Sequence, residues 1–172
     1  MLHVGPLAPA ILANPFYNPW LVIHVLGAAT ALLIGPVQFV PRVRARYPAW
    51  HRRTGQVYVA GCLIGGVAGF VVACGSTAGP IAKVGFGALA IAWFFTTAQA
   101  WRMALQRRFV RHRVWMIRSF ALTYAAVTLR VYLLGLPLLP ISPLAGYQAI
   151  SFLCWIPNLL IAELYVRRNP GL

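Results

Sequence analysis

The sequence predicts an all-α integral membrane protein, a bundle of about five transmembrane helices, and two observations carry this prediction. Of the 172 residues, 60% are hydrophobic and only 9% are charged, and the mean hydropathy is +0.74. Soluble domains carry roughly 25% charged residues, so this composition is typical of a chain that lies in a bilayer. The second observation is length. A helix needs roughly 20 apolar residues to cross the hydrocarbon, and the chain contains about five such runs.

The expected spans cover about residues 20–40, 54–74, 84–102, 114–136 and 143–164. The fourth span contains Arg118 and Arg130, but long arginine side chains reach the interfaces and leave the stretch between them uncharged. Residues 1–18 are rich in proline and aromatic residues, which predicts an N-terminal extension in the interface. Residues 19–166 then form a single bundle, and residues 167–172 form a short tail.

The charge distribution predicts the orientation of this bundle. Fifteen Lys and Arg residues stand against one acid, Glu163, and give a net charge of +14. The arginines gather between the first and second spans, between the third and fourth, and after the fifth, which all share one side in a five-span topology. The positive-inside rule places this side in the cytoplasm, with the N-terminus outside. We therefore expect a bacterial cytoplasmic (inner) membrane protein that contacts anionic lipids of the inner leaflet and does not bind nucleic acid.

The first two spans carry faces of small residues. The first places Ala28, Ala31 and Gly35 between two polar residues, His24 and Gln38, at steps of three and four that define one helical face. Transmembrane helices approach each other closely over such faces, so this face is expected to look into the bundle.

The second span carries Gly61, Gly65 and Gly69, a repeated Gly-x-x-x-Gly motif. This motif predicts another closely packed helix. It also offers a contact surface through which a homo-oligomer could form.

The fourth and fifth spans carry further polar and charged residues. His112, Ser119, Thr123 and Arg130 follow each other at steps of seven and four, which predicts an inward-facing polar stripe. His24 and Arg130 would form a polar pair toward the outer side.

In the fifth span Pro157 should kink the helix, because proline lacks a backbone donor. Glu163 needs a cationic partner, and Arg118 or Arg113 lies at a matching depth. We therefore expect an ion pair between helices, with a proton-transfer role as the alternative.

The candidate site lies toward the cytoplasmic end, where His51 and His112 open the second and fourth spans. Two histidines on different helices at one depth can ligate a b-type haem, and arginines can neutralise its propionates. Arg52, Arg118 and Gln38 would complete this site. Two other interpretations stay open: the same cluster could bind a phosphorylated or quinone head group, or the histidines could simply anchor the interface. No metal is expected beyond a haem iron held by the two histidines.

Other chemistry finds little support in the sequence. Cys62, Cys74 and Cys154 are odd in number and lie in or beside apolar runs, which disfavours disulfides and a zinc site. Phosphate-binding loops, nucleophile elbows and the His-Glu-x-x-His motif are not found. A single acid excludes catalysis by paired carboxylates. The sequence does not decide whether the protein is an enzyme by another mechanism.

Three motifs in order give the chain a family resemblance. Gly35-Pro36-Val37-Gln38-Phe39 closes the first span. His51-Arg52-Arg53-Thr54-Gly55-Gln56-Val57-Tyr58 opens the second, and His112-Arg113-Val114-Trp115-Met116-Ile117-Arg118-Ser119 opens the fourth. With them the sequence resembles domain-of-unknown-function family 2306, predicted prokaryotic membrane proteins, over about Trp20 to Leu136. That family typically has an arginine at the position of Gln56, so one motif cation is missing. The resemblance implies a multi-helix inner-membrane protein and no settled activity.

Three functional hypotheses follow. The most specific is a small redox module in which His51 and His112 ligate haem b and electrons pass to or from quinone. The second is a transporter or binding protein for a small solute or lipid, suggested by the polar stripe, Pro157 and Glu163. The third is a scaffold subunit without catalysis that binds partners through its glycine face.

Overall fold

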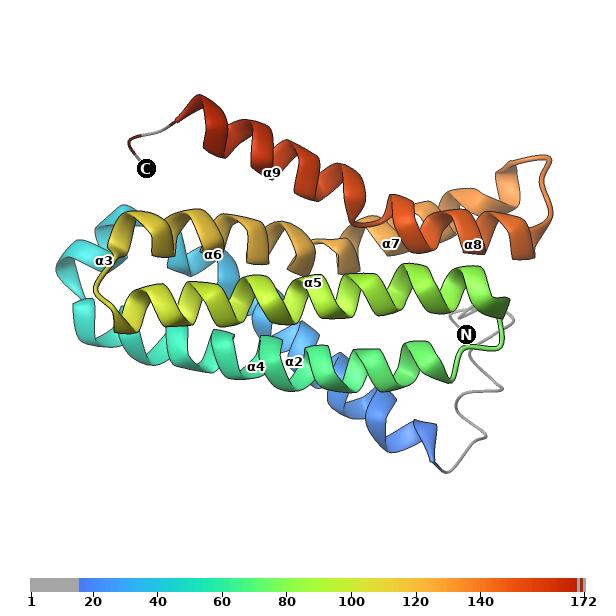
Figure 1. Ribbon diagram of the computed structural model, residues 1–172, viewed down its shortest axis with the longest axis horizontal. Coiled ribbons are helices and arrows are strands. Elements are labelled where there is room, and N and C mark those ends of the chain that lie inside the picture. Colours follow the sequence, from blue (N-terminus) through green and yellow to red (C-terminus); the bar gives the residue numbers. More distant parts are fainter. Residues whose placement is uncertain (1–15, 170, 172) are drawn as a thin grey trace.

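The computed structural model describes residues 16–169 and 171, and the described chain is built from helices joined by short connections (Figure 1). In order, they are α2 (Tyr17–Gln38), α3 (Pro41–Arg46), α4 (Pro48–Cys74), α5 (Gly79–Leu105), α6 (Phe109–Thr123), α7 (Ala125–Gly135), the 3-10 turn η1 (Leu136–Leu138), α8 (Pro143–Leu153) and α9 (Ile156–Arg168).

Five helical segments are long and apolar enough to cross a membrane: Tyr17–Gln38, Pro48–Cys74, Gly79–Leu105, Phe109–Leu138 and Pro143–Arg168. The prediction of an all-helical chain with five such segments is therefore confirmed. Large apolar side chains on their outer surfaces are widely exposed, for example Leu33 at 77% and Leu134 at 78%. Contact with lipid tails explains this exposure, because lipid tails are as apolar as leucine itself.

The helices extend further than the uncharged runs that predicted them. α4 begins at Pro48, before the expected start at residue 54, because proline is favourable in a first helical turn and the arginines of that turn are exposed. α9 continues to Arg168, so Arg167 and Arg168 are helical and the expected tail is shorter. Most of the expected extension at residues 1–18 lies outside the described residues, and α2 already begins at Tyr17.

Helices α4, α5 and α6 lie side by side, α2 crosses behind α4, and α8 lies along α5 (Figure 1). The contact between α2 and α4 is made by glycines. A Cβ atom on Gly27 would come 2.6 Å from the carbonyl oxygen of Gly61, so the backbones touch directly. Ala31 on the same face of α2 is fully buried. The small-residue faces of the first two spans therefore pack against each other, as close helix packing in a membrane requires.

The fourth and fifth spans are each interrupted. The fourth changes from α6 to α7 at Tyr124, and the fifth changes from α8 to α9 between Leu153 and Ile156. Pro157 explains the second break, because it cannot donate to the carbonyl four residues earlier, that of Leu153, where α8 ends. The expected kink is therefore present, and α9 leaves the direction of α8 (Figure 1).

Side chains connect the two breaks to each other. The hydroxyl of Thr128 and the amide of Asn158 both donate to the carbonyl oxygen of Cys154, at 2.5 and 3.1 Å. The amide of Asn158 also donates to the hydroxyl oxygen of Thr128 at 3.0 Å. Backbone groups freed by a break in a membrane helix need such partners, because lipid offers none.

Candidate functional site

The cationic side chains gather at one end of the bundle, which we call the basic end. Helix α3, the first turns of α4 and α6 and the last turns of α5 and α9 meet there, because the spans alternate in direction. The arginines of this end are Arg42, Arg44, Arg46, Arg52, Arg53, Arg102, Arg107, Arg108, Arg111, Arg113, Arg167 and Arg168. Lys83 lies near the start of α5, at the opposite end.

His51 and His112 come together at the basic end although 61 positions separate them in the sequence. His51 lies in the first turn of α4 and His112 in the first turn of α6, within electrostatic reach of each other. Arg44 on α3 acts electrostatically on both rings. Sequence reasoning chose both histidines and missed Arg44, because the bend that returns α3 over α4 leaves no signal in the pattern.

The two imidazoles differ in their hydrogen bonds. Nδ1 of His112 donates to the carbonyl oxygen of Ala100 on α5 at 2.8 Å, which fixes the ring and leaves Nε2 available. Nδ1 of His51 is buried and has no hydrogen-bond partner among the described residues. A buried polar atom without a partner costs roughly 1 to 3 kcal/mol, which distinguishes His51 from His112.

Gln38 lies at the same end but is occupied by the protein. Its amide nitrogen donates to the hydroxyl of Thr54 at 2.8 Å, and Thr54 in turn donates to the carbonyl oxygen of Trp50 at 2.9 Å. These bonds tie the end of α2 to the first turn of α4. Gln38 therefore supports the position of the helix that carries His51, while Arg52 is exposed on the same turn.

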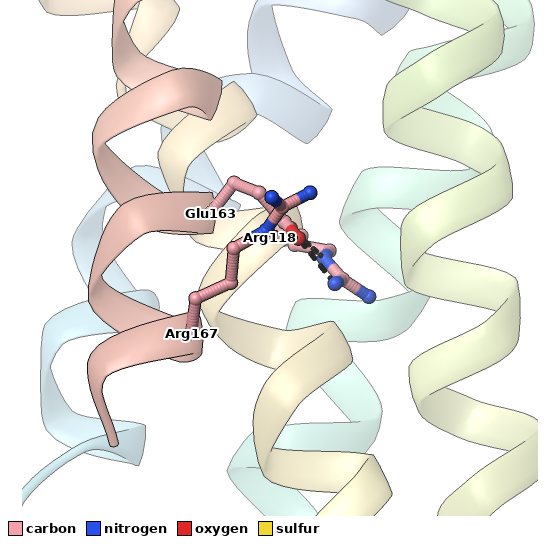
Figure 2. Close-up of polar contacts among 3 residues, drawn as sticks. All are labelled: Arg118, Glu163 and Arg167. Atoms are coloured by element: carbon pink, nitrogen blue, oxygen red, sulfur yellow. Dashed lines mark hydrogen bonds and ion pairs between the residues drawn. The ribbon is translucent and has the colours of Figure 1, made fainter. Parts of the chain in front are cut away.

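Glu163 accepts hydrogen bonds from two arginines on different helices (Figure 2). Arg118 of α6 donates from Nε and Nη2 to Oε2 at 3.0 and 2.8 Å, and Arg167 of α9 donates from Nε to Oε1 at 3.0 Å. The expected ion pair between helices is thus present with Arg118. The guanidinium of Arg118 also lies 4.7 Å from the ring centre of Trp115. Arg118 is therefore occupied by protein groups and does not lie free beside the histidines.

His24 and Arg130 are not joined by a hydrogen bond in the described structure. Nδ1 of His24 donates to the carbonyl oxygen of Gly65 at 2.8 Å, and its ring meets Trp93 edge-on. Arg130 is exposed and donates to the carbonyl oxygen of Ala126 on its own helix at 2.6 Å. The two residues interact electrostatically without a direct contact in that region.

The expectation that the whole polar stripe faces inward is wrong for Arg130. Ser119 and Thr123 are buried, whereas Arg130 lies beyond the break at Tyr124. A step of seven residues returns to one face only in a continuous helix, and the helix is interrupted at Tyr124 between Thr123 and Arg130.

A buried hydrogen-bonded cluster fills the centre of the bundle. The hydroxyl of Tyr58 is 2.9 Å from that of Ser119 and 3.1 Å from that of Thr123. Thr97 bonds to Ser119 at 2.7 Å, and the indole nitrogen of Trp93 donates to Thr123 at 2.9 Å. Sequence reasoning placed Ser119 and Thr123 in the polar stripe and named Tyr58 only within a family motif, and it missed Trp93 and Thr97. The paired threonines 96 and 97 inside an apolar run were the available signal.

The glycine face of α4 is covered within the chain. Gly61 and Gly65 contact Gly27 of α2, and a Cβ atom on Gly69 would lie 2.7 Å from the imidazole of His24. A homo-oligomer through this face would have to separate α2 from α4. The described residues contain no cluster of three or more His, Cys, Asp or Glu side chains, and the three cysteines are free thiols.

Comparison with known families identifies the chain. The model of the predicted membrane protein family DUF2306 matches residues 21–166. The chain belongs to this family. The match covers every described membrane-spanning segment almost completely, including the fifth, which lies beyond the motifs that suggested the resemblance. No curated protein and no solved structure matches the chain. DUF2306 membership thus establishes a predicted multi-pass membrane protein, and its activity has to be argued from the site.

Proposed function

We propose that this protein is a small redox module of the bacterial cytoplasmic membrane that holds a b-type haem between His51 and His112. The observation that supports this proposal is the buried Nδ1 atom of His51, which has no partner among the described residues, on a ring within electrostatic reach of a second imidazole. A buried ring nitrogen without a partner is costly unless something coordinates or hydrogen-bonds that same nitrogen. Two histidines from different helices are the minimal ligand set for a haem in a helical bundle.

The state of His112 fits the same role. Metal-ligating histidines almost always donate their second ring nitrogen to a carbonyl or carboxylate oxygen, which fixes the tautomer and the ring orientation. His112 makes such a bond to the carbonyl oxygen of Ala100 and keeps Nε2 available. The lack of a third His, Cys, Asp or Glu ligand in the described residues favours a haem over a bare metal ion, because a haem supplies the remaining ligands itself.

The charges around the pair also fit. Arg44 and Arg52 act electrostatically on His51 and are exposed, so they would be the cations that neutralise the propionates of a bound haem. In this role they take the place proposed for Arg118, which is bound to Glu163. A bound haem would supply one-electron transfer, with membrane quinone as the partner. The residues of this chain would hold its iron, neutralise its carboxylates and set its depth in the bilayer.

The features that suggested other functions are engaged elsewhere. The transporter hypothesis relied on Glu163 and Arg130, but the first is held by two arginines and the second donates to its own helix. At the break before Pro157, the carbonyl oxygen of Cys154 is occupied by Thr128 and Asn158. The scaffold hypothesis relied on a glycine face that α2 already covers. None of these features includes a buried polar atom without a partner, as His51 does among the described residues.

An absorption spectrum of the purified full-length protein, expressed with ample haem, tests the proposal. We expect a Soret band that shifts on reduction and that is lost in His51→Ala and in His112→Ala. His24→Ala is the matched control, because His24 is a histidine of the same bundle outside the site, and it should keep the band. A protein without a Soret band, or a band unchanged in both site variants, would refute haem ligation.

The orientation is part of the proposal and rests on the positive-inside rule: the basic end lies in the cytoplasm and the opposite end outside. Cys74 offers a direct test, because it is exposed at the end of α4 opposite the basic end, whereas Cys62 and Cys154 are buried. A membrane-impermeant maleimide added to intact spheroplasts should label the wild type and not Cys74→Ser. In the Cys74→Ser background, Ala45→Cys on α3 should be labelled only after the membrane is opened. The reverse pattern would overturn the orientation.

A further inference from the structure

We infer that a groove on the lipid-facing side of the bundle binds an acyl chain of one anionic phospholipid from the leaflet at the basic end. The groove has a volume of about 670 Å³, within the range of roughly 300 to 1,000 Å³ that is common for ligand pockets. Three helices form it, with α6 as the floor and α2 and α9 as the walls. Residues that define its ends and floor are Pro36, Phe39, Phe120, Tyr124, Asn158 and Tyr165.

The groove exists because the chain breaks and turns. The break before Pro157 directs α9 away from α8 (Figure 1), and the Arg118–Glu163 pair holds α9 on α6. On α2, Gly35 lets the Phe120 ring lie directly against the helix, and the rings of Phe39 and Phe120 are 5.3 Å apart. The floor is thereby filled, and the space above it, between α2 and α9, stays open to the bilayer.

The chemistry of the lining selects an apolar occupant. The amide of Asn158 at the deep end already donates to protein oxygens, so it does not call for a polar ligand. The other lining groups are aliphatic or aromatic apart from the two tyrosine hydroxyls. Side chains that line an empty space lose their dispersion contacts, so an acyl chain lying in the groove would restore them.

The charges beyond the groove select an anionic head group. Each helix that forms the groove is followed by an arginine toward the basic end. Arg42 is three residues after Phe39, Arg113 four residues before Ile117, and Arg168 three residues after Tyr165. A second hollow of about 390 Å³ lies on α3, and Arg42 and Arg46 line it.

The protein itself cannot neutralise these arginines. Its sole acidic residue, Glu163, is already bound by Arg118 and Arg167. A lipid phosphate supplies the missing negative charge, and a chain attached to that head group would run down the groove. An uncharged quinone would leave the arginines without counter-charges, so the charge favours a phospholipid.

Native mass spectrometry of the full-length protein in detergent, with added lipids of identical acyl chains, tests this inference. We expect one molecule of phosphatidylglycerol to stay bound at energies that remove phosphatidylcholine. Ala121→Phe places a ring in the groove and should abolish retention. Ala60→Phe is its control, since Ala60 is an exposed alanine of α4, which does not line the groove. Its retention should equal that of the wild type.

Arginine substitutions at the surface complete the test without disturbing the core. Arg42→Gln and Arg168→Gln should each weaken retention about fivefold, as expected for one basic residue facing an anionic lipid. Arg102→Gln on α5 changes the same charge elsewhere on the basic end and should leave retention unchanged. Equal binding of both lipids, loss of retention in every arginine variant alike, a bound quinone in place of phospholipid, or a dimer that Ala121→Phe dissociates would each overturn the inference.

Discussion

Arg118 and Glu163 join α6 to α9 through two hydrogen bonds to the same carboxylate oxygen, at 3.0 and 2.8 Å (Figure 2). They lie close to the surface but are mostly covered, with 21% and 31% of their side chains exposed. This pair sets the position of α9 after the break at Pro157. Because α9 forms one wall of the groove, the pair also determines the shape of the candidate lipid site.

We predict that Glu163→Gln lowers the free energy of unfolding by about 1 to 2 kcal/mol, because a charge-assisted bond between helices is lost while both side chains stay partly hydrated. Unfolding of the purified protein by SDS in mixed micelles, followed by circular dichroism, measures this change. Arg167→Gln removes the other bond to the same carboxylate, but Arg167 is 74% exposed. Its loss should cost no more than about 0.5 kcal/mol. Equal effects of both variants would mean that the link between helices adds nothing.

The hydroxyl of Tyr58 supports a second prediction. It bonds to Ser119 and Thr123 in a fully buried cluster, so Tyr58→Phe leaves two hydroxyls with one partner fewer. Hydrogen bonds between transmembrane helices contribute about 0.6 kcal/mol on average and up to about 1.7, and the loss should lie in this range. Tyr132→Phe is the control, because Tyr132 is exposed on α7. The same SDS unfolding should show a loss for Tyr58→Phe alone, and a stable Tyr58→Phe variant would contradict the prediction.

The sequence alone predicts those features of the structure that depend on residues within one continuous helix, and it fails where the helix is interrupted. Apolar run length predicted the five spans, and the steps of the small residues predicted that the first two spans each have a closely packing face, because both signals are properties of one continuous helix. The predicted face of the first span did not include Gly27, the residue that meets Gly61. The orientation of Arg130 failed because the phase count assumed a continuous helix, and the chain breaks at Tyr124. Pro157 predicted the break between α8 and α9, whereas no proline or glycine in the sequence predicts the break at Tyr124.

The candidate site was predictable in part. His51 and His112 could be placed at one depth from topology, and Glu163 had to find a cation because it is the sole acid. Which cation, however, depends on how α9 turns. Arg118 was assigned to the haem site and also named, with Arg113, as a partner of Glu163, and the structure shows it bound to Glu163. Arg44 was missed because its position follows from a bend between α3 and α4. Charge and depth are readable from the sequence, but the choice among neighbouring arginines is made by tertiary packing.

Asn158 carries a prediction about the paired helix breaks. Its amide reaches the Cys154 carbonyl and the Thr128 hydroxyl, so it bridges the two interruptions. Asn158→Leu should destabilise the protein by about 1 to 3 kcal/mol, because buried oxygens lose a donor that lipid cannot replace. Hydrogen exchange measured by mass spectrometry should show faster exchange localised to residues 121–128 and 151–158. Exchange that is unchanged there, or that rises evenly over the bundle, would argue against a local bridge.

Gly27 gives the sharpest prediction about the fold. A methyl group there would lie 2.6 Å from the carbonyl oxygen of Gly61 and 2.9 Å from the Cα atom of Gly65, and backbone atoms cannot rotate away. Gly27→Ala should therefore force α2 off α4 and cost about 1 to 3 kcal/mol, although alanine is the better helix former. Gly135→Ala is the matched control, because nothing lies within 4 Å of the position its methyl would take. It should be neutral or stabilising by up to about 1 kcal/mol. Thermal unfolding of both variants in one detergent decides the matter: if Gly27→Ala is as stable as Gly135→Ala, α2 and α4 do not touch through their glycines.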